Sequence, residues 1–153
     1  MHLPRWLPRP FRRRPRADAL GRRGERAAAR ALRRGGYRIV ARRLRLPGAE
    51  VDILAVHRET VVLVEVKTTA SPSRGAPAAR VDVGKRSRLA RARRELARDP
   101  RWAGRAWRLD VVAVTLEGRR ARCEILEGFA VLSAPRDDAS ARHGLRPRGR
   151  RAE

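Results

Sequence analysis

The sequence of 153 residues predicts an α/β domain whose elements follow the order α-β-β-β-α-β-β and form a sandwich around a mixed central sheet. Three observations predict this class. Small apolar residues recur at helical spacing near the start, five segments rich in valine, isoleucine and leucine follow, and a second helical pattern separates the third segment from the fourth. Because a helix commonly connects two parallel strands, the third and fourth strands are expected to run parallel.

The first element is an amphipathic helix over residues 17–36. Asp18 is expected to cap its start, and Gly35-Gly36 to end it. The arginines lie opposite a stripe of small residues, and Glu25 lies at the border between the two faces. Small residues on that stripe would let the helix lie close to a sheet. The stripe consists of Leu20, Gly24, Ala27, Ala28, Ala31 and Leu32.

Three strands are expected next, over residues 37–45, 50–56 and 60–67, because branched apolar residues dominate them. A loop rich in proline, serine and glycine follows over residues 68–79. The second and third strands form a hairpin. Arg-Glu is a poor two-residue turn, so two alternatives are open: a four-residue loop over 57–60 would preserve the register of the strands, and a bulge would break it.

The expected hairpin register gathers charged residues on one face. Asp52 lies opposite Glu65, and Glu50 lies opposite Lys67. Cross-strand neighbours on one face have Cβ atoms about 4.5–5.5 Å apart, so these side chains are expected to meet. The other face is expected to be wholly apolar and to consist of Val51, Ile53, Ala55, Val62, Val64 and Val66.

A second helix is expected over residues 83–98, ending before Pro100. Lys85 lies one turn before the apolar stripe of this helix and in line with it, so it is expected to point toward the same end of the sheet. Two further strands are expected over residues 108–116 and 121–131. The apolar stripe of the second helix consists of Leu89, Ala92 and Leu96.

Positive charge dominates the composition. The formal net charge is +23 and the sequence pI is near 12.0. A folded domain over residues 17–132, between disordered basic segments at 1–16 and 133–153, is expected to carry much of this charge. Such a surplus favours a polyanionic partner, most plausibly nucleic acid, although an arginine-rich coding bias is an alternative source of the charge.

The composition also favours a cytoplasmic protein without a membrane partner. The single cysteine, Cys123, cannot form an internal disulfide, which fits a reducing compartment. No stretch approaches the roughly 18 apolar residues of a transmembrane helix. The basic segment at the start is not followed by the apolar region of a secretory signal.

The gathered acids and lysine suggest metal chemistry. Two carboxylates at the separation expected for Asp52 and Glu65 can share one Mg²⁺, which prefers oxygen ligands and keeps several waters. Lysine is rare here: Lys67 and Lys85 are the two lysines among 39 basic residues. A compact ammonium group can approach a water or a phosphate oxygen as a point charge, whereas the guanidinium of arginine is planar and bulkier. A solvent-exposed ion pair at the end of a hairpin is the alternative interpretation.

This arrangement resembles a known group of enzymes. An Asp on one strand followed by Glu-x-Lys on the next resembles the PD-(D/E)xK nucleases, the restriction-endonuclease-like group, and a Glu on the preceding helix resembles the Holliday junction resolvases within it. The chain resembles more closely the YraN-like bacterial proteins (uncharacterised protein family 0102), which are predicted nucleases. It departs from that pattern at flanking positions: Arg43, Ala49, Val51 and Thr69. The matching residues are Gly21, Gly24, Glu25, Ala28, Gly36, Tyr37, Gly48, Glu50, Asp52, Val64 to Lys67, Lys85 and Asp110 to Val112.

The resemblance implies a role for each matching charged residue. Asp52 and Glu65 would be metal ligands for Mg²⁺ or Mn²⁺, Lys67 would lie beside the attacking water, and Glu25 would be a further catalytic acid. Lys85, Arg86 and Arg88, which lie at the start of the second helix, are expected to bind nucleic acid.

Alternatives stay open for several of these residues. Glu25 could pair with a neighbouring arginine on its helix, and Lys85 could be a solvated residue. Asp110 is expected to form an ion pair at the end of the sheet, and no catalytic role is expected for His57, which lies at the other end of the hairpin from the acids.

The implied activity is metal-dependent hydrolysis of DNA phosphodiesters, with branched or junction DNA as one candidate substrate. Because junction-cutting enzymes commonly work as symmetric dimers, a homodimer is a compatible assembly. The alternative is a non-catalytic nucleic-acid-binding or adaptor protein that keeps a vestigial nuclease fold.

Overall fold

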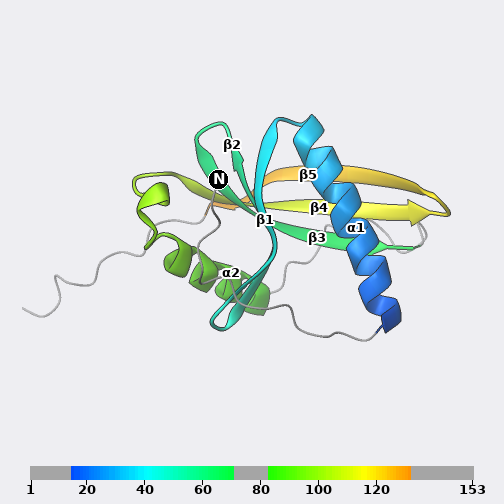
Figure 1. The fold of residues 1–153 in the computed structure, drawn as a ribbon, viewed down its shortest axis with the longest axis horizontal. Helices are drawn as coiled ribbons and strands as arrows, with labels where there is room; N and C mark the ends of the chain where they lie inside the picture. Colours follow the sequence, from blue (N-terminus) through cyan, green and yellow to red (C-terminus); the bar gives the residue numbers. More distant parts are fainter. Residues whose placement is uncertain (1–14, 71–82, 132–153) are drawn as a thin grey trace, which may run out of the picture.

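Five strands form one mixed sheet in the order β1-β2-β3-β4-β5 (Figure 1). The computed structural model describes residues 15–70 and 83–131. All neighbouring strands are antiparallel except β3 and β4, which are parallel. The order α-β-β-β-α-β-β and the parallel pair are therefore confirmed. The strands are β1 (Tyr37–Leu46), β2 (Ala49–His57), β3 (Thr60–Thr69), β4 (Trp107–Glu117) and β5 (Arg120–Val131).

The helices are α1 (Pro15–Arg34), α2 (Val83–Leu96) and the short 3-10 helix η3 (Pro100–Trp102). The expected basic segments, at 1–16 and 133–153, lie almost wholly outside the described residues. None of the described helices is both long and apolar enough to cross a membrane.

Helix α1 begins earlier than its capping pattern predicts. It starts at Pro15, a residue suited to a first helical turn, so Asp18 lies inside the helix and the prediction that it caps the start was wrong. The end is as predicted. Gly36 has φ of +84°, and the Gly35 N–H donates to the Ala31 carbonyl at 3.0 Å.

Helix α1 lies across one face of the sheet (Figure 1). Its small residues are buried there, whereas Leu20 is 37% exposed, contrary to its expected place on the stripe. The core between α1 and the sheet, which we term the α1-side core, consists of Ala27, Ala28, Ala29, Leu32, Tyr37, Ile53, Ala55, Val62, Val64, Val112, Val114 and Leu116.

Gly24 marks the closest approach of α1 to β3. A Cβ atom at this position would overlap Thr68 Oγ1 and would lie 2.9 Å from both Thr68 Cβ and Thr68 Cγ2. We therefore expect Gly24→Ala to lower the free energy of unfolding by about 1–3 kcal/mol, as overpacking does. Urea denaturation measures this change.

The matched control is Gly21→Ala, because a Cβ at Gly21 would meet no atom within 4 Å. This second variant should be neutral or more stable, since alanine favours helix by up to about 1 kcal/mol over glycine. Combining Gly24→Ala with Thr68→Gly should recover part of the loss. Equal effects of the two glycine variants would show that α1 does not pack on Thr68 as described.

The β2–β3 hairpin has the predicted register. Ile53 pairs with Val64, and His57 pairs with Thr60. The turn has two residues, 58–59, although Arg-Glu was expected to be a poor two-residue turn, and Arg58 takes a left-handed φ of +55°. The turn therefore keeps the register through a backbone conformation that is uncommon for arginine.

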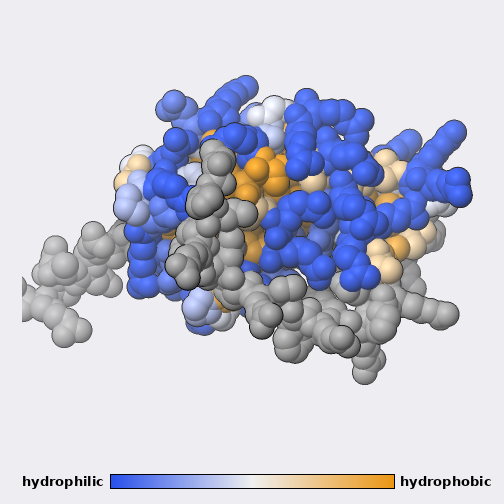
Figure 2. Space-filling model, viewed as in Figure 1, coloured by the Kyte–Doolittle hydropathy of each residue, from blue (hydrophilic) through white to orange (hydrophobic). Residues whose placement is uncertain are grey.

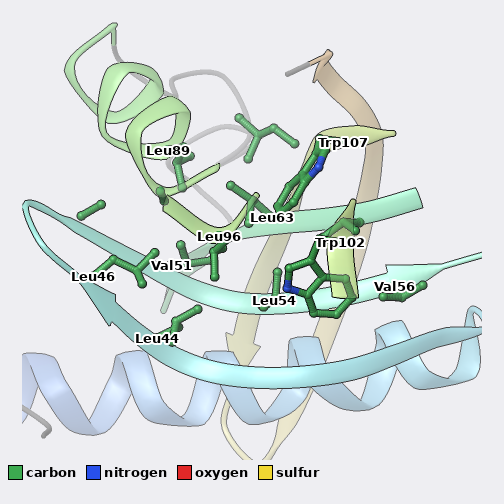
Figure 3. Close-up of a cluster of buried hydrophobic side chains, with 14 of the residues drawn as sticks. Leu44, Leu46, Val51, Leu54, Val56, Leu63, Leu89, Leu96, Trp102 and Trp107 are labelled. Atoms are coloured by element: carbon green, nitrogen blue, oxygen red, sulfur yellow. The ribbon is translucent and has the colours of Figure 1, made fainter. Parts of the chain in front are cut away.

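Helix α2 packs on the opposite face and on β2 in particular. In Figure 3, Leu89 and Leu96 of α2 lie above the sheet together with Trp102 and Trp107, while α1 runs below it. We term this cluster the α2-side core. It consists of Leu44, Leu46, Ala49, Val51, Leu54, Val56, Val61, Leu63, Leu89, Ala92, Leu96, Trp102, Trp107, Leu109 and Val111.

One residue of the α2-side core contradicts the predicted alternation. Val51 packs with Leu54 in this core, and Ile53 packs on the α1 side, although Val51 and Ile53 were expected to share a face. The alternation of β2 therefore breaks at the residue between them, Asp52. This break is the structural basis of the site described next.

Candidate active site

Strands β2 and β3 separate at Asp52. The cross-strand pairs extend as far as Ile53 with Val64. Beyond that pair, Asp52 Oδ2 accepts a hydrogen bond from the Val66 N–H at 2.9 Å. A side-chain oxygen thus satisfies a backbone donor that a strand carbonyl would otherwise satisfy. This bond holds the Asp52 carboxylate against β3, beside Glu65.

Glu65 contacts both lysines of the chain. Its side chain is 5% exposed, with Oε1 3.0 Å from Lys67 Nζ and Oε2 2.6 Å from Lys85 Nζ. Lys67 reaches Glu65 because residues two apart on a strand share a face. Lys85 reaches it from the first turn of α2. The structure thus brings together Asp52, Glu65, Lys67 and Lys85, at the end of the sheet where the sequence places them.

Glu50 does not join this group as expected. Its Cα is paired with that of Arg45 on β1, and its Oε1 lies 3.8 Å from Arg45 Nη2. The expected partner, Lys67, contacts Glu65. The physical reason is the separation of the strands at Asp52, which leaves Glu50 in the β1–β2 ladder and away from β3.

The surroundings of Asp52 disfavour its charged form. Burial and, after it, the neighbouring Glu65 charge raise the pKa of Asp52 to about 7, although Lys85 and the Val66 N–H act in the opposite direction. A carboxyl group in this state either binds a proton near neutral pH or is stabilised by a cation.

The raised pKa of Asp52 predicts a pH dependence of stability in the presence of a chelator. A carboxyl that binds its proton more tightly in the folded state stabilises the fold most below its unfolded pKa of 3.8, and this contribution is lost as the pH rises to about 7. The free energy of unfolding of the wild type, relative to Asp52→Asn, should therefore fall between about pH 4 and pH 7. Urea denaturation of both proteins measures the difference, and a difference that does not change with pH would contradict the assignment.

The Asp52–Glu65 pair fits a small divalent cation. Mg²⁺ is commonly bound by one or two carboxylates, with waters and substrate phosphates as the other ligands. Glu65 Oε2 is buried, and the Lys85 ammonium nitrogen lies 2.6 Å from it. Within residues 15–70 and 83–131, no group of three or more His, Cys, Asp or Glu side chains is placed to hold a metal. The described chain would therefore supply two ligands.

Glu25 is placed beside a strand. Its Oε2 lies 3.7 Å from Nε of Arg43, which belongs to β1 and has a left-handed φ of +52°. This partner lies on the sheet, whereas the alternative interpretation of the sequence placed it on the same helix. Gly24, the residue before Glu25, packs against Thr68 of β3. The backbone of α1 therefore passes close to the strand that carries Glu65 and Lys67.

The two arginines expected to bind nucleic acid lie on α2 after Lys85. Arg86 and Arg88 are both exposed. The Arg86 guanidinium lies over the Phe129 ring, with Cζ 5.5 Å from its centroid. Both arginines are therefore accessible to a ligand in solvent, on the same helix that carries Lys85.

A second polar cluster is centred on Asp110 of β4, whose Cα is paired with that of Val64, the residue before Glu65 on β3. Asp110 is fully buried and forms the expected ion pair, with Arg108 Nε 2.9 Å from Oδ1. Oδ2 accepts a hydrogen bond from the Tyr37 hydroxyl at 2.8 Å, and Oδ1 accepts one from the Gly128 N–H at 2.9 Å. Burial and the neighbouring Asp110 raise the pKa of Tyr37. His57 also contacts this cluster, through Arg108 Nη2 at 2.8 Å from its Nδ1.

The sequence predicts an ion pair for Asp110, but it does not predict which residues contact the Asp110 carboxylate. A bulge in β5 opposite Asp110 brings Gly128 to the carboxylate, and a bulge is a three-dimensional feature that residue spacing does not reveal. The cluster is satisfied by its own hydrogen bonds, which indicates a structural role.

Comparison with known proteins gives one consistent result. The sequence model of the "Uncharacterised protein family UPF0102" matches residues 24–114. A protein of Moorella thermoacetica named "UPF0102 protein" is 43% identical over 110 residues, which cover 71% of this chain and 92% of the relative. Proteins of the same name from Arthrobacter sp. and Beutenbergia cavernae are 42% and 44% identical, and each match covers 72% of this chain and 95% of the relative. The matched segment contains Glu25, Asp52, Glu65, Lys67 and Lys85.

Proposed function

This chain belongs to the uncharacterised protein family UPF0102, and we propose that it is a divalent-metal-dependent endonuclease that hydrolyses DNA phosphodiester bonds. One observation carries the proposal: a pair of adjacent, largely buried carboxylates, Asp52 and Glu65, with two ammonium groups in contact with Glu65. An isolated surface ion pair would need neither the burial nor the second acid.

Each residue of the pair and its neighbours has a chemical role in the proposal. Mg²⁺ or Mn²⁺ held by Asp52 and Glu65 would lower the pKa of a bound water and stabilise charge on the phosphodiester. Lys67, with its side chain 35% exposed, is accessible to orient the attacking water or a phosphate oxygen. Lys85 is proposed to hold a phosphate from the start of α2, and Glu25 is proposed as the further acid.

The charge of α2 supports a DNA substrate. Six of its residues are basic and one is acidic, and the exposed ones, including Arg86 and Arg88, flank the residue that reaches Glu65. The face that carries α1 is also strongly hydrophilic, as Figure 2 shows. Arginine side chains on both faces would bind phosphates without regard to sequence and with strong dependence on salt.

We further propose that the protein acts in the cytoplasm, where its single cysteine, Cys123, would stay reduced. Branched DNA with two-fold symmetry would suit two copies of the chain, so we propose a homodimer on such a substrate.

A cleavage assay tests the proposed activity. The full-length protein is incubated with end-labelled linear, forked and four-way-junction DNA, with Mg²⁺, with Mn²⁺ and with EDTA. We expect products that require a metal and that increase with enzyme concentration. If no substrate yields a product with either metal while the DNA stays bound, the protein is a nucleic-acid-binding protein and the proposal is wrong.

A further inference from the structure

Arg93 is a buried cation that the proposed site does not use. It lies on α2 and is 8% exposed, and its buried Nε and Nη1 have no hydrogen-bond partner among residues 15–70 and 83–131. Its guanidinium lies over the Trp107 ring, with Cζ 5.7 Å from the ring centroid. Stacking on an aromatic ring offsets only part of the cost of removing a charge from water, because the N–H groups of Nε and Nη1 stay unsatisfied.

The electrostatics agree with an incompletely compensated charge. Burial lowers the pKa of Arg93 from its usual value. The acidic residue next to it on α2, Glu95, contacts Arg98, with Oε2 2.6 Å from Arg98 Nη1. A guanidinium with unsatisfied N–H donors is stabilised most by an anion that accepts two hydrogen bonds at once, such as a phosphate.

The position of Arg93 relates it to the candidate active site. Lys85, Leu89 and Arg93 lie four residues apart along one stripe of α2, and Lys85 contacts Glu65. The axial distance from Lys85 to Arg93 is about 12 Å at 1.5 Å per residue. One strand of a duplex rises by about 3.4 Å per nucleotide along the axis and also winds around it, so this distance spans only a few phosphates of one strand.

We propose that Arg93 binds a backbone phosphate of the nucleic-acid strand whose scissile phosphate lies at Asp52 and Glu65. This inference rests on the proposed function. The long aliphatic part of the side chain lets the guanidinium turn from Trp107 toward solvent, where exposed Arg91 attracts the same strand. Binding then exchanges unsatisfied donors for charge-assisted hydrogen bonds.

Arg93→Met tests the inference, with Arg94→Met as the matched control that removes the same charge from an exposed neighbour. The affinity of the full-length protein for labelled DNA is measured in EDTA, so that cleavage cannot contribute. We expect Arg93→Met to weaken binding at least about tenfold, and Arg94→Met less than about threefold. Without DNA, Arg93→Met should unfold at the same temperature as the wild type or higher, because it removes an incompletely paired buried charge.

Three results would overturn the inference. Equal affinities of the two variants would leave Arg93 as a packing residue over Trp107. A lower unfolding temperature of Arg93→Met without DNA would mean that the folded chain itself already compensates the charge. Stabilisation of the wild type, but not of Arg93→Met, by inorganic phosphate, with unchanged DNA affinity, would assign the residue to a small free anion. The binding assay omits metal, so its result does not depend on whether the protein cleaves DNA. Equal DNA affinities of the two variants would overturn the role of Arg93 only, and the cleavage assay would still decide the proposed nuclease function.

Discussion

Replacing Lys67 with methionine is expected to lower the rate of metal-dependent DNA cleavage at least about a hundredfold, while the affinity for DNA stays within about twofold. Methionine has a similar length and lacks the ammonium that lies 3.0 Å from Glu65 Oε1. Without it, neither the attacking water nor the phosphate would have this positive charge beside it. The measurement is the single-turnover cleavage rate at saturating enzyme.

Lys67→Arg sharpens this prediction. A planar guanidinium keeps the charge but cannot approach as a point charge or release a proton, so we expect little recovery of the cleavage rate. Arg105→Met is a control that removes a positive charge from an exposed residue, in the connection between η3 and β4 and beside the start of β3. Cleavage by Lys67→Met at the wild-type rate would show that the activity belongs to another site or another protein.

Removing the Asp110 carboxylate is expected to have the largest effect on stability. Asp110→Ala leaves three donors in a buried place without their acceptor: the Arg108 guanidinium, the Tyr37 hydroxyl and the Gly128 N–H. Breaking one side of a buried ion pair costs about 3–5 kcal/mol. Urea denaturation should therefore show a loss of this size in the free energy of unfolding.

Glu95→Ala is the matched control. Glu95 also forms an ion pair with an arginine, but its side chain is 39% exposed and that of Arg98 is 76% exposed. Exposed pairs contribute about 0–1 kcal/mol, so this variant should be nearly as stable as the wild type. A loss for Asp110→Ala no larger than that for Glu95→Ala would mean that the Asp110 cluster does not stabilise the fold.

Much of the fold is predictable from local patterns. The β2–β3 register follows from alternation and from a hairpin centred on two residues, and it places Asp52 and Glu65 together correctly. Lys85 is predictable for the same kind of reason, because helical periodicity puts it in line with Leu89.

What the sequence does not predict depends on where strands separate or bulge. Val51 changes face and Glu50 stays with β1 because β2 leaves β3 at Asp52, and no residue spacing marks that point. The positive φ angles of Arg58 and Arg43 could not be predicted either, because arginine rarely adopts a left-handed backbone conformation.

The buried charges form a third class that patterns miss. Arg93 belongs to a helix rich in arginine, and nothing in its neighbourhood along the chain distinguishes it from the exposed Arg94. Only packing against Trp107 separates the two. Composition therefore predicts a basic protein, whereas the structure identifies which basic residue lacks compensation.

Direct measurement of metal binding tests the central claim, that Asp52 and Glu65 jointly hold a divalent ion. Mn²⁺ is titrated into the full-length protein and free Mn²⁺ is measured by electron paramagnetic resonance. We expect one ion per chain at a site that Asp52→Asn weakens at least about tenfold, since the ion loses one of two carboxylate ligands. Glu117→Gln, which changes an exposed acid at the last residue of β4, should bind as the wild type does. Unchanged binding by Asp52→Asn would contradict the assignment of the site.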